Sequence, residues 1–233
     1  MNCSSVIIDD EEVPFGSNLL FTLSSGAVLG VEICEDLWVP VPPSSELCLN
    51  GADIIANLSA SNEAVTKNDY RKNIISVQSA KCFCAYVYAS SGVGESSTDL
   101  VFSGACTIAE NGAILSESER FAFDGSSASA FIDFEKLNSE RVRNGSFSDN
   151  NEILRENDFT VIPAYVNEAE YDDIKRSFIP IRLFRQTKAR GSFAAAKYSQ
   201  FKVRDLPSVL RIPDLKRLLS VFPADLILRW HFL

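Results

Sequence analysis

Short apolar runs separated by turn residues recur along the chain and predict buried β-strands. The clearest run covers residues 26–33, which are largely β-branched and nearly continuous. Residues 104–109 and 113–116 flank the turn Glu110-Asn111-Gly112 and predict a β-hairpin. Further strands are expected over residues 19–22, 53–58, 85–89, 128–134 and 158–163.

Three segments between these runs have helical features. Pro42-Pro43-Ser44-Ser45 predicts the start of a helix that ends at Asn50-Gly51. A short helix is expected over residues 135–142. Residues 65–82 predict an amphipathic helix, with Tyr70, Ile74, Val77 and Ala80 on its apolar face and Lys67, Arg71 and Lys72 on its wetter face. This alternation of strands and helices predicts an α/β fold.

Cys34 is the residue that best suits catalytic chemistry. It ends the run 26–33 and is followed by Glu35, Asp36 and Trp38, and then by three prolines within six residues. In α/β folds, reactive groups are commonly found where a strand opens into a loop. The alternative is that Cys34 is one more buried thiol, because free cysteine is among the most buried residue types. The pattern alone leaves both readings open.

The histidine content narrows the possible chemistry. The single histidine is His231, three residues from the C-terminus. His231 is therefore the one histidine that could serve in a Cys-His or Ser-His pair or as a zinc ligand, which makes such chemistry a poor explanation of this chain. A cysteine nucleophile would need a carboxylate or an amine as its base.

Composition is that of a cytoplasmic α/β protein. Hydrophobic residues make up 46% of the chain, and no stretch is long or apolar enough to cross a membrane. The net charge of −9 argues against a nucleic-acid partner. The six cysteines do not form the pattern of a disulfide framework, and Cys82 and Cys84 are too close in sequence for paired metal ligands. We therefore expect these two to be core thiols and expect no metal site.

Several blocks between Val13 and Phe121 carry a family resemblance. They are Val13-Pro14-Phe15-Gly16, residues 31–43, residues 56–62, residues 85–90 with 92–96, and residues 108–112 with 116–121. In this order they resemble the glutamine amidohydrolase domain of glutamine-dependent NAD synthetases, which belongs to the nitrilase superfamily. The resemblance implies a partial nitrilase-type αββα sandwich, its C-terminal part, over residues 1–143. A connector toward a synthetase domain follows over residues 144–182.

The resemblance also assigns roles to individual residues. A Glu-Lys-Cys triad hydrolyses glutamine to glutamate and ammonia in this family, and Cys34 matches its nucleophile. The N–H of Glu35 would stabilise the oxyanion, Ser61 and Lys67 would bind glutamine, and Trp38 and Glu95 are possible pocket residues. Without the resemblance, Ser61 is equally a helix N-cap, Lys67 a solvated helix charge, Trp38 a core aromatic and Glu95 part of a polar loop.

The chain departs from the family pattern before Cys34. The triad Glu and Lys precede the cysteine in the family, whereas the 33 residues before Cys34 contain neither Lys nor Arg. The acidic run Asp9-Asp10-Glu11-Glu12 is interpreted as a solvated loop. We therefore expect that this chain alone does not hydrolyse glutamine.

Residues 183–233 are interpreted as an out-of-frame tail without a selected fold. Residues 218–232 can be back-translated with codons whose shifted frame reads Ser-Gly-Gly-Leu-Asp-Ser within an apolar segment. That loop resembles the ATP site of the synthetase domain. The hypothesis is a frameshift near Leu183, with His231 as its accidental product.

Three functions are compatible with these patterns. The first is the glutaminase part of a glutamine-dependent NAD synthetase, whose intact form would be a homo-oligomer that uses ATP and magnesium in its synthetase domain to amidate nicotinic acid adenine dinucleotide. The second is a free-standing nitrilase-type amidase, which would lack the continuation over residues 158–182. The third is a non-catalytic interaction module. The breadth of the matching blocks favours the first.

Overall fold

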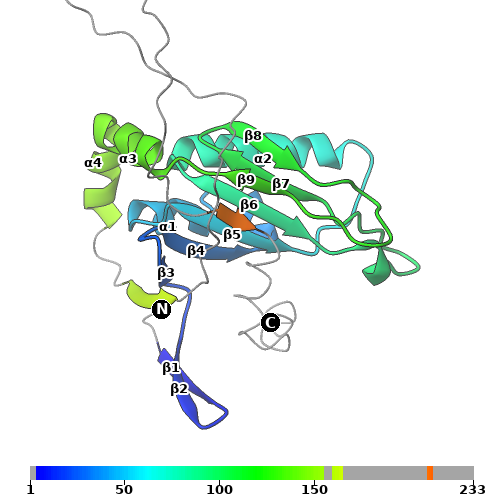
Figure 1. Cartoon of the computed structure of the whole chain (residues 1–233), viewed down its shortest axis with the longest axis horizontal. Helices are drawn as coiled ribbons and strands as arrows, with labels where there is room; N and C mark the ends of the chain where they lie inside the picture. Colours follow the sequence, from blue (N-terminus) through cyan, green and yellow to red (C-terminus); the bar gives the residue numbers. More distant parts are fainter. Residues whose placement is uncertain (1–3, 155–158, 165–208, 212–233) are drawn as a thin grey trace, which may run out of the picture.

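The computed structural model describes residues 4–154, 159–164 and 209–211. Its centre is one seven-stranded mixed sheet with the order β10-β3-β4-β5-β6-β7-β8 (Figure 1). The strands are β3 (Leu19–Leu23), β4 (Val28–Ile33), β5 (Ile54–Ser59), β6 (Ala85–Ser90), β7 (Cys106–Glu110), β8 (Ala113–Glu117) and β10 (Thr160–Ala164). The predicted α/β class and the predicted strands in this sheet are confirmed.

The three central strands β4, β5 and β6 are parallel to one another, so the chain must cross the sheet between them. Helix α1 (Pro43–Leu49) makes the first crossover and helix α2 (Lys67–Cys82) the second. Helix α1 lies close to β4 at Gly30, where an added Cβ would come within 3.2 Å of the Leu47 side chain. A larger residue at this position would therefore require the Leu47 side chain to move by a few tenths of an ångström.

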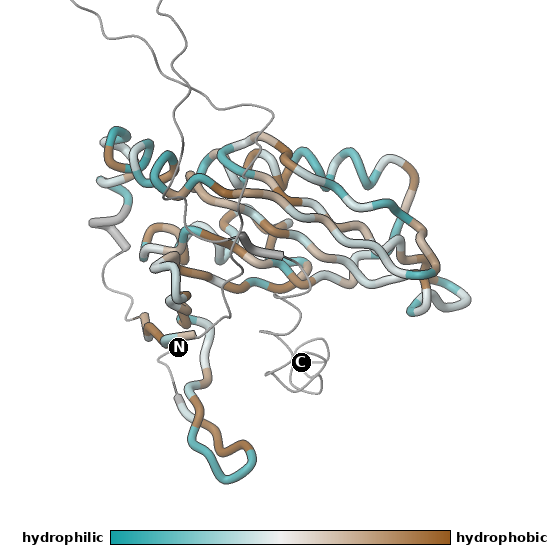
Figure 2. Tube along the Cα trace, in the orientation of Figure 1, coloured by the Kyte–Doolittle hydropathy of each residue, from teal (hydrophilic) through white to brown (hydrophobic). Residues whose placement is uncertain are grey.

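Side chains alternate between two apolar layers, one on each face of the sheet. Ile54 and Ala56 belong to one core cluster, and Ile55 between them belongs to the other. Helices α1 and α2 cover the face of Ile55. Helix α3 (Phe134–Arg143) and the segment before it cover the opposite face, where Leu137 is fully buried. Figure 2 shows the resulting hydrophobic stretches along the central strands.

The predicted hairpin around residues 110–112 is confirmed as β7 and β8. Asn111 and Gly112 both have positive φ, of 45° and 87°. This is the backbone of a tight hairpin turn, and it favours asparagine followed by glycine because other residues are strained there. The edge strand β8 is mostly exposed.

The hairpin of β1 (Ser4–Ile8) and β2 (Glu11–Phe15) was not predicted from the pattern. It projects from the main sheet (Figure 1). Asp9 and Asp10 form its turn, both with positive φ, whereas Glu11 and Glu12 belong to β2. The interpretation of residues 9–12 as a loop is therefore right for the first two residues and wrong for the other two.

Two elements lie inside the range 144–182 that the sequence suggests as a connector. Helix α4 (Gly145–Leu154) packs against α1, and the Phe147 ring meets the Phe83 ring edge-on with centroids 5.6 Å apart. Strand β10 extends the main sheet by pairing in parallel with β3. Of the predicted tail, the described residues are those of β11 (Val209–Arg211), which pairs with β9 (Ser129–Phe131). The rest of the tail lies outside the described residues.

Helix α2 is present, but its buried face is only partly the predicted one: Ile74 packs against the core and Ala80 is partly buried, as predicted. Arg71, Ile75 and Gln78 are buried, whereas Tyr70 and Val77 are each 57% exposed. The polar residues of the inner face have buried partners: Arg71 pairs with Glu63, and Gln78 donates to Ser44 Oγ. Polar pairing therefore overrides the apolar spacing on which the prediction depended.

Thr66, the N-cap of α2, adopts the left-handed φ of 67° and makes no side-chain capping hydrogen bond. A β-branched residue is strained there, by about 1–3 kcal/mol. We expect Thr66→Gly to raise the free energy of unfolding by about 1 kcal/mol after the entropic cost of glycine. Thr66→Ala is the control, because it removes the hydroxyl but keeps the strain. Urea unfolding measures both variants, and an equal effect of the two would contradict the strain.

No helix among the described residues has the combined length and hydropathy that a membrane span requires.

Candidate active site

Cys34 lies at the carboxyl end of the central strand β4, as predicted. The strand ends at Ile33, and Cys34 begins the 3₁₀ helix η1 (Cys34–Trp38) with a positive φ of 48°. Its side chain is 4% exposed. A non-glycine residue in this conformation costs free energy and is held only where its surroundings determine it. Such strained positions are common at catalytic centres.

Two side chains hold the turn at Cys34. The carboxylate of Asp36 accepts the N–H of Ile33 at 2.7 Å, which closes the turn from its own residues. From the neighbouring strand β5, Asn57 Nδ2 lies 3.5 Å from the carbonyl oxygen of Cys34. Hydrogen bonds thus hold the backbone N–H of the residue before Cys34 and the backbone carbonyl of Cys34 itself.

The sulfur itself receives a hydrogen bond through a short chain of hydroxyl groups. Tyr88 OH donates to Ser59 Oγ at 2.7 Å, and Ser59 Oγ donates to Cys34 Sγ at 3.4 Å. Burial raises the pKa of Tyr88, so its hydroxyl stays protonated and can donate near neutral pH. A donor aimed at the sulfur suits a group that carries negative charge when it attacks.

Glu32 is a buried carboxylate two residues before Cys34, with 2% exposure. It accepts a hydrogen bond from Tyr86 OH, a second from Asn57 Nδ2 at 3.4 Å and a third from the N–H of Ser44 at 2.8 Å. Asn57 therefore lies between this carboxylate and the carbonyl of Cys34. Burial raises the pKa of Glu32, and its hydrogen bonds offset only part of the increase.

The raised pKa of Glu32 predicts a pH-dependent stability difference. Folded Glu32 binds its proton at higher pH than the unfolded chain does, so ionisation above the ordinary glutamate pKa of 4.5 opposes folding. We expect wild type to lose stability relative to Glu32→Gln as pH rises from 4.5 through the raised folded pKa. Urea unfolding of both proteins across this range measures the difference, and a difference that does not change with pH would contradict the prediction.

Lys67 and Trp38 come together beside the turn of Cys34. Lys67 Nζ lies 5.6 Å from the centroid of the Trp38 ring and donates to Asn62 Oδ1 at 2.9 Å. The Tyr70 ring also packs against the Trp38 ring, and their centroids lie 5.3 Å apart. Lys67 is thus half-buried and partnered, which is not the environment of a solvated helix charge.

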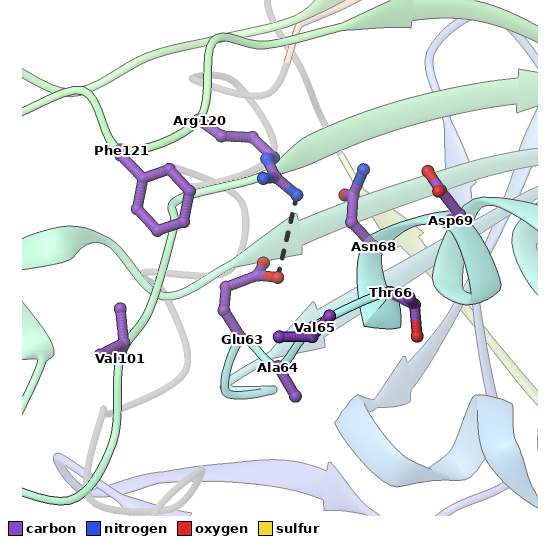
Figure 3. Close-up of a pocket in the computed structure, with 9 residues that line it drawn as sticks. All are labelled: Glu63, Ala64, Val65, Thr66, Asn68, Asp69, Val101, Arg120 and Phe121. Atoms are coloured by element: carbon purple, nitrogen blue, oxygen red, sulfur yellow. Dashed lines mark ion pairs between the residues drawn. The ribbon is translucent and has the colours of Figure 1, made fainter.

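An open pocket of about 520 Å³ lies next to the start of α2, between the loop 63–66 and the segment around Phe121 (Figure 3). Glu63 lines it and is bound by Arg71 Nη1 at 2.7 Å and more distantly by Arg120 at 3.9 Å. Burial alone would raise the pKa of Glu63, but hydrogen bonds from Arg71 and Ser103 lower it overall. Glu63 is therefore a carboxylate, and the pocket has a charged wall.

The family of carbon-nitrogen hydrolases matches residues 9–133, more than half of the chain. The chain belongs to this family. The resemblance found in the sequence blocks is therefore confirmed, and Cys34 lies inside the matched part of a carbon-nitrogen hydrolase domain.

The chain is similar in sequence to glutamine-dependent NAD(+) synthetases of mycobacteria. The protein of Mycobacterium tuberculosis (strain H37Rv) is 47% identical over 154 residues, which cover 65% of this chain and 23% of the relative. The protein of Mycobacterium leprae is 43% identical over 183 residues, 74% of this chain and 27% of the relative. The chain thus spans about a quarter of the length of these relatives. A glutamine-dependent NAD(+) synthetase structure from Cytophaga hutchinsonii has a TM-score of 0.47 at 27% identity, covering 55% of this chain and 20% of that one.

Within this carbon-nitrogen hydrolase domain, the structure places the other predicted site residues as follows. The Glu35 side chain is exposed, and its N–H directly follows Cys34 in the chain. Ser61 is buried, and because α2 begins only at Lys67 with Thr66 as its N-cap, Ser61 is not the helix cap that the pattern allowed. Glu95 is exposed on the 3₁₀ helix η2 (Val93–Glu95).

Several residues of the site were not anticipated from the sequence. Ser59 is the last residue of β5 and Tyr88 lies within β6, while Asn57 and Glu32 are polar residues inside β5 and β4. A charged or amide residue inside an otherwise buried strand is a usable signal, because such groups need buried partners. Among the described residues, no group of three or more His, Cys, Asp or Glu side chains is arranged to hold a metal ion.

Proposed function

We propose that this chain carries the nucleophile part of a glutaminase site that supplies ammonia for the amidation of nicotinic acid adenine dinucleotide to NAD. The observation that carries the proposal is Cys34, held at positive φ at the end of β4 with the Ser59 hydroxyl donating to its sulfur. Membership of the carbon-nitrogen hydrolases supports hydrolysis of a carbon-nitrogen bond. The names of the mycobacterial relatives support glutamine as the substrate.

The chemistry is an acyl transfer to sulfur. The Cys34 thiolate attacks the side-chain amide carbon of glutamine, the C–N bond breaks, and protonated nitrogen leaves as ammonia. Water then attacks the thioester, releasing glutamate and returning the proton and the thiol. The N–H of Glu35 would donate to the oxyanion, and Ser61 and Lys67 would hold the rest of the substrate beside Trp38.

The first step needs a base that takes the thiol proton. Glu32 is nearby in sequence but is committed to Tyr86, Asn57 and Ser44. The segment before Cys34 contains no lysine or arginine to complete a Glu-Lys-Cys triad. We therefore expect that the 233-residue chain alone releases no ammonia from glutamine above a Cys34→Ala background, which a coupled glutamate dehydrogenase assay measures. Cys34-dependent release would show that the chain contains its own base.

The ammonia would serve an ATP- and magnesium-dependent amidation in the rest of a longer enzyme. The described residues offer no arranged metal-ligand group for that chemistry, so no step is assigned to them. The similarity to the Mycobacterium leprae protein covers 74% of this chain, beyond the hydrolase domain itself. This extent favours a synthetase over a free-standing amidase.

The proposal is tested by transplanting the matched domain. Residues 9–133 would replace the corresponding segment of the Mycobacterium tuberculosis relative, and NAD formation would be measured with glutamine and, separately, with ammonium chloride. We expect the chimera to use both nitrogen donors. A chimera that keeps ammonia-dependent synthesis but cannot use glutamine would count against a glutaminase role for this chain.

A further inference from the structure

Arg71 is a buried cation inside the carbon-nitrogen hydrolase domain, and the proposed reaction gives it no role. It lies in the second turn of α2, and its side chain is 1% exposed. Its Nη1 donates to Glu63 Oε1 at 2.7 Å. Its Nε and Nη2 are buried and have no hydrogen-bond partner among the residues that the structure describes. Glu63 is therefore the acceptor on which this charge depends, because a buried charge without a partner is strongly destabilising.

The Glu63 carboxylate joins several segments of the chain. Ser103 Oγ donates to the same oxygen as Arg71, and Arg120 lies 3.9 Å from the other oxygen (Figure 3). The Glu63 N–H donates to the carbonyl of Val101 at 2.7 Å. Hydrogen bonds to a charged carboxylate are stronger than those between neutral groups. Glu63 thus fixes the loop that follows β5 against two later parts of the chain.

Glu63 also lies in the middle of the stretch that carries the proposed glutamine contacts. Ser61 precedes it by two residues and is buried, and Lys67 follows it by four. Lys67 Nζ donates at 2.9 Å to Asn62 Oδ1, on the residue next to Glu63. Between β5 and the start of α2 at Lys67 this stretch forms neither helix nor strand. Its shape therefore depends on side-chain hydrogen bonds of this kind.

Arg71 makes a second contact, with the hydroxyl chain that reaches the Cys34 sulfur. Its guanidinium carbon lies over the Tyr88 ring, 5.6 Å from the ring centroid. Tyr88 OH donates to Ser59 Oγ, which donates to Cys34 Sγ. A cation is attracted to an aromatic face, most strongly where water is excluded. One buried side chain thus connects the loop of Glu63 to the residues that hold the sulfur.

We propose that Arg71 and Glu63 are a positioning pair, which holds residues 61–67 in a fixed position relative to Cys34 and thereby sets the affinity for glutamine. This inference rests on the proposed glutaminase function and adds to it the residues that shape the substrate loop. Arg71 and Glu63 act through Ser61 and Lys67, whose side chains are in place before glutamine arrives. Binding groups that are already ordered lose less freedom on binding, so the affinity is higher.

The test measures glutamine binding by the full 233-residue chain, which we expect to leave glutamine intact. Equilibrium dialysis with radiolabelled glutamine gives the dissociation constant, and urea unfolding of the same preparation gives the folded fraction. Glu63→Gln keeps the shape of the side chain but removes the charge that Arg71 and Ser103 bind. We expect it to raise the dissociation constant for glutamine by about tenfold or more.

Two further variants keep the test decisive if Glu63→Gln does not fold. Glu63→Gln combined with Arg71→Met removes both buried charges, so no unpaired ion remains to destabilise the fold. We expect this double variant to recover stability and still bind glutamine as weakly as Glu63→Gln. Ser103→Ala keeps the ion pair and removes one hydrogen bond to Glu63. We expect it to show a smaller loss of affinity.

The matched control is Glu110→Gln, which neutralises another buried carboxylate. Glu110 accepts hydrogen bonds from Lys136 Nζ at 3.1 Å and from the N–H of Asp133 at 2.8 Å. It pairs with Ala85 at the start of β6, whereas Cys34 follows the end of the parallel strand β4. Glu110 thus lies at the opposite end of the sheet from the site. We expect Glu110→Gln to lower stability without changing the dissociation constant for glutamine.

The outcomes distinguish this inference from the proposed function. The positioning role is overturned if Glu63→Gln binds glutamine as tightly as the unsubstituted chain, or if the double variant recovers affinity together with stability. It is also overturned if Glu110→Gln weakens binding equally, or if the unsubstituted chain binds no glutamine. The glutaminase function is decided separately by glutamine use in the chimera, and it stands there even where the positioning role fails.

Discussion

Replacing Cys34 with alanine is expected to abolish glutamine-dependent NAD formation in the chimera that carries residues 9–133. Loss of the attacking sulfur removes the thioester pathway altogether, and removal of a covalent nucleophile reduces turnover by about 10⁴-fold or more. Synthesis from ammonium chloride should not change, because it bypasses the amide cleavage. The ratio of the two activities is therefore the measurement, and it is independent of how much protein is expressed.

The control for Cys34→Ala is Cys106→Ala, which removes a different buried thiol. We expect it to keep the ratio of glutamine-dependent to ammonia-dependent synthesis. If Cys34→Ala keeps this ratio as well, Cys34 is a buried core thiol without a catalytic role, and the proposed glutaminase function fails.

Replacing Arg141 with methionine is expected to lower the free energy of unfolding by about 3–5 kcal/mol. Arg141 and Asp53 are only 10% and 11% exposed, and Arg141 Nη1 lies 3.2 Å from Asp53 Oδ1. Arg141 Nη2 also donates to the carbonyls of Ala52 and Cys82, and the guanidinium lies 5.5 Å from the Phe147 ring. Methionine would leave a buried carboxylate and two buried carbonyls without this donor.

Asp53 separates the charge effect from lost packing. Burial already raises the pKa of Asp53 despite Arg141. Without Arg141 the buried negative charge has lost its ion-pair partner, and Asp53→Asn removes that charge. We expect Asp53→Asn to recover part of the loss in the Arg141→Met background. The comparison pair is Lys72 with Glu117, at 2.8 Å but 29% and 41% exposed. Lys72→Met should cost less than about 1 kcal/mol. Equal losses for Arg141→Met and Lys72→Met by urea unfolding would refute the argument.

Local patterns were sufficient wherever a residue's environment depends on its neighbours in sequence. The apolar run before Cys34 predicted β4 because a continuous β-branched run suits a strand buried on both faces. Asn111 and Gly112 predicted the hairpin because the turn needs positive φ. The position of Cys34 at a strand end followed from the same reasoning, and the family resemblance followed from ordered blocks of such residues.

Contacts between distant residues were decided by the tertiary structure alone. The apolar spacing of α2 indicated only part of the buried face, because Arg71 and Gln78 find buried partners on Glu63 and Ser44 that no local pattern contains. The same holds for Ser59 and Tyr88, which form the hydrogen-bond chain to the Cys34 sulfur. A buried polar group is stable only with its partner, and the partner is chosen by how the strands and helices pack.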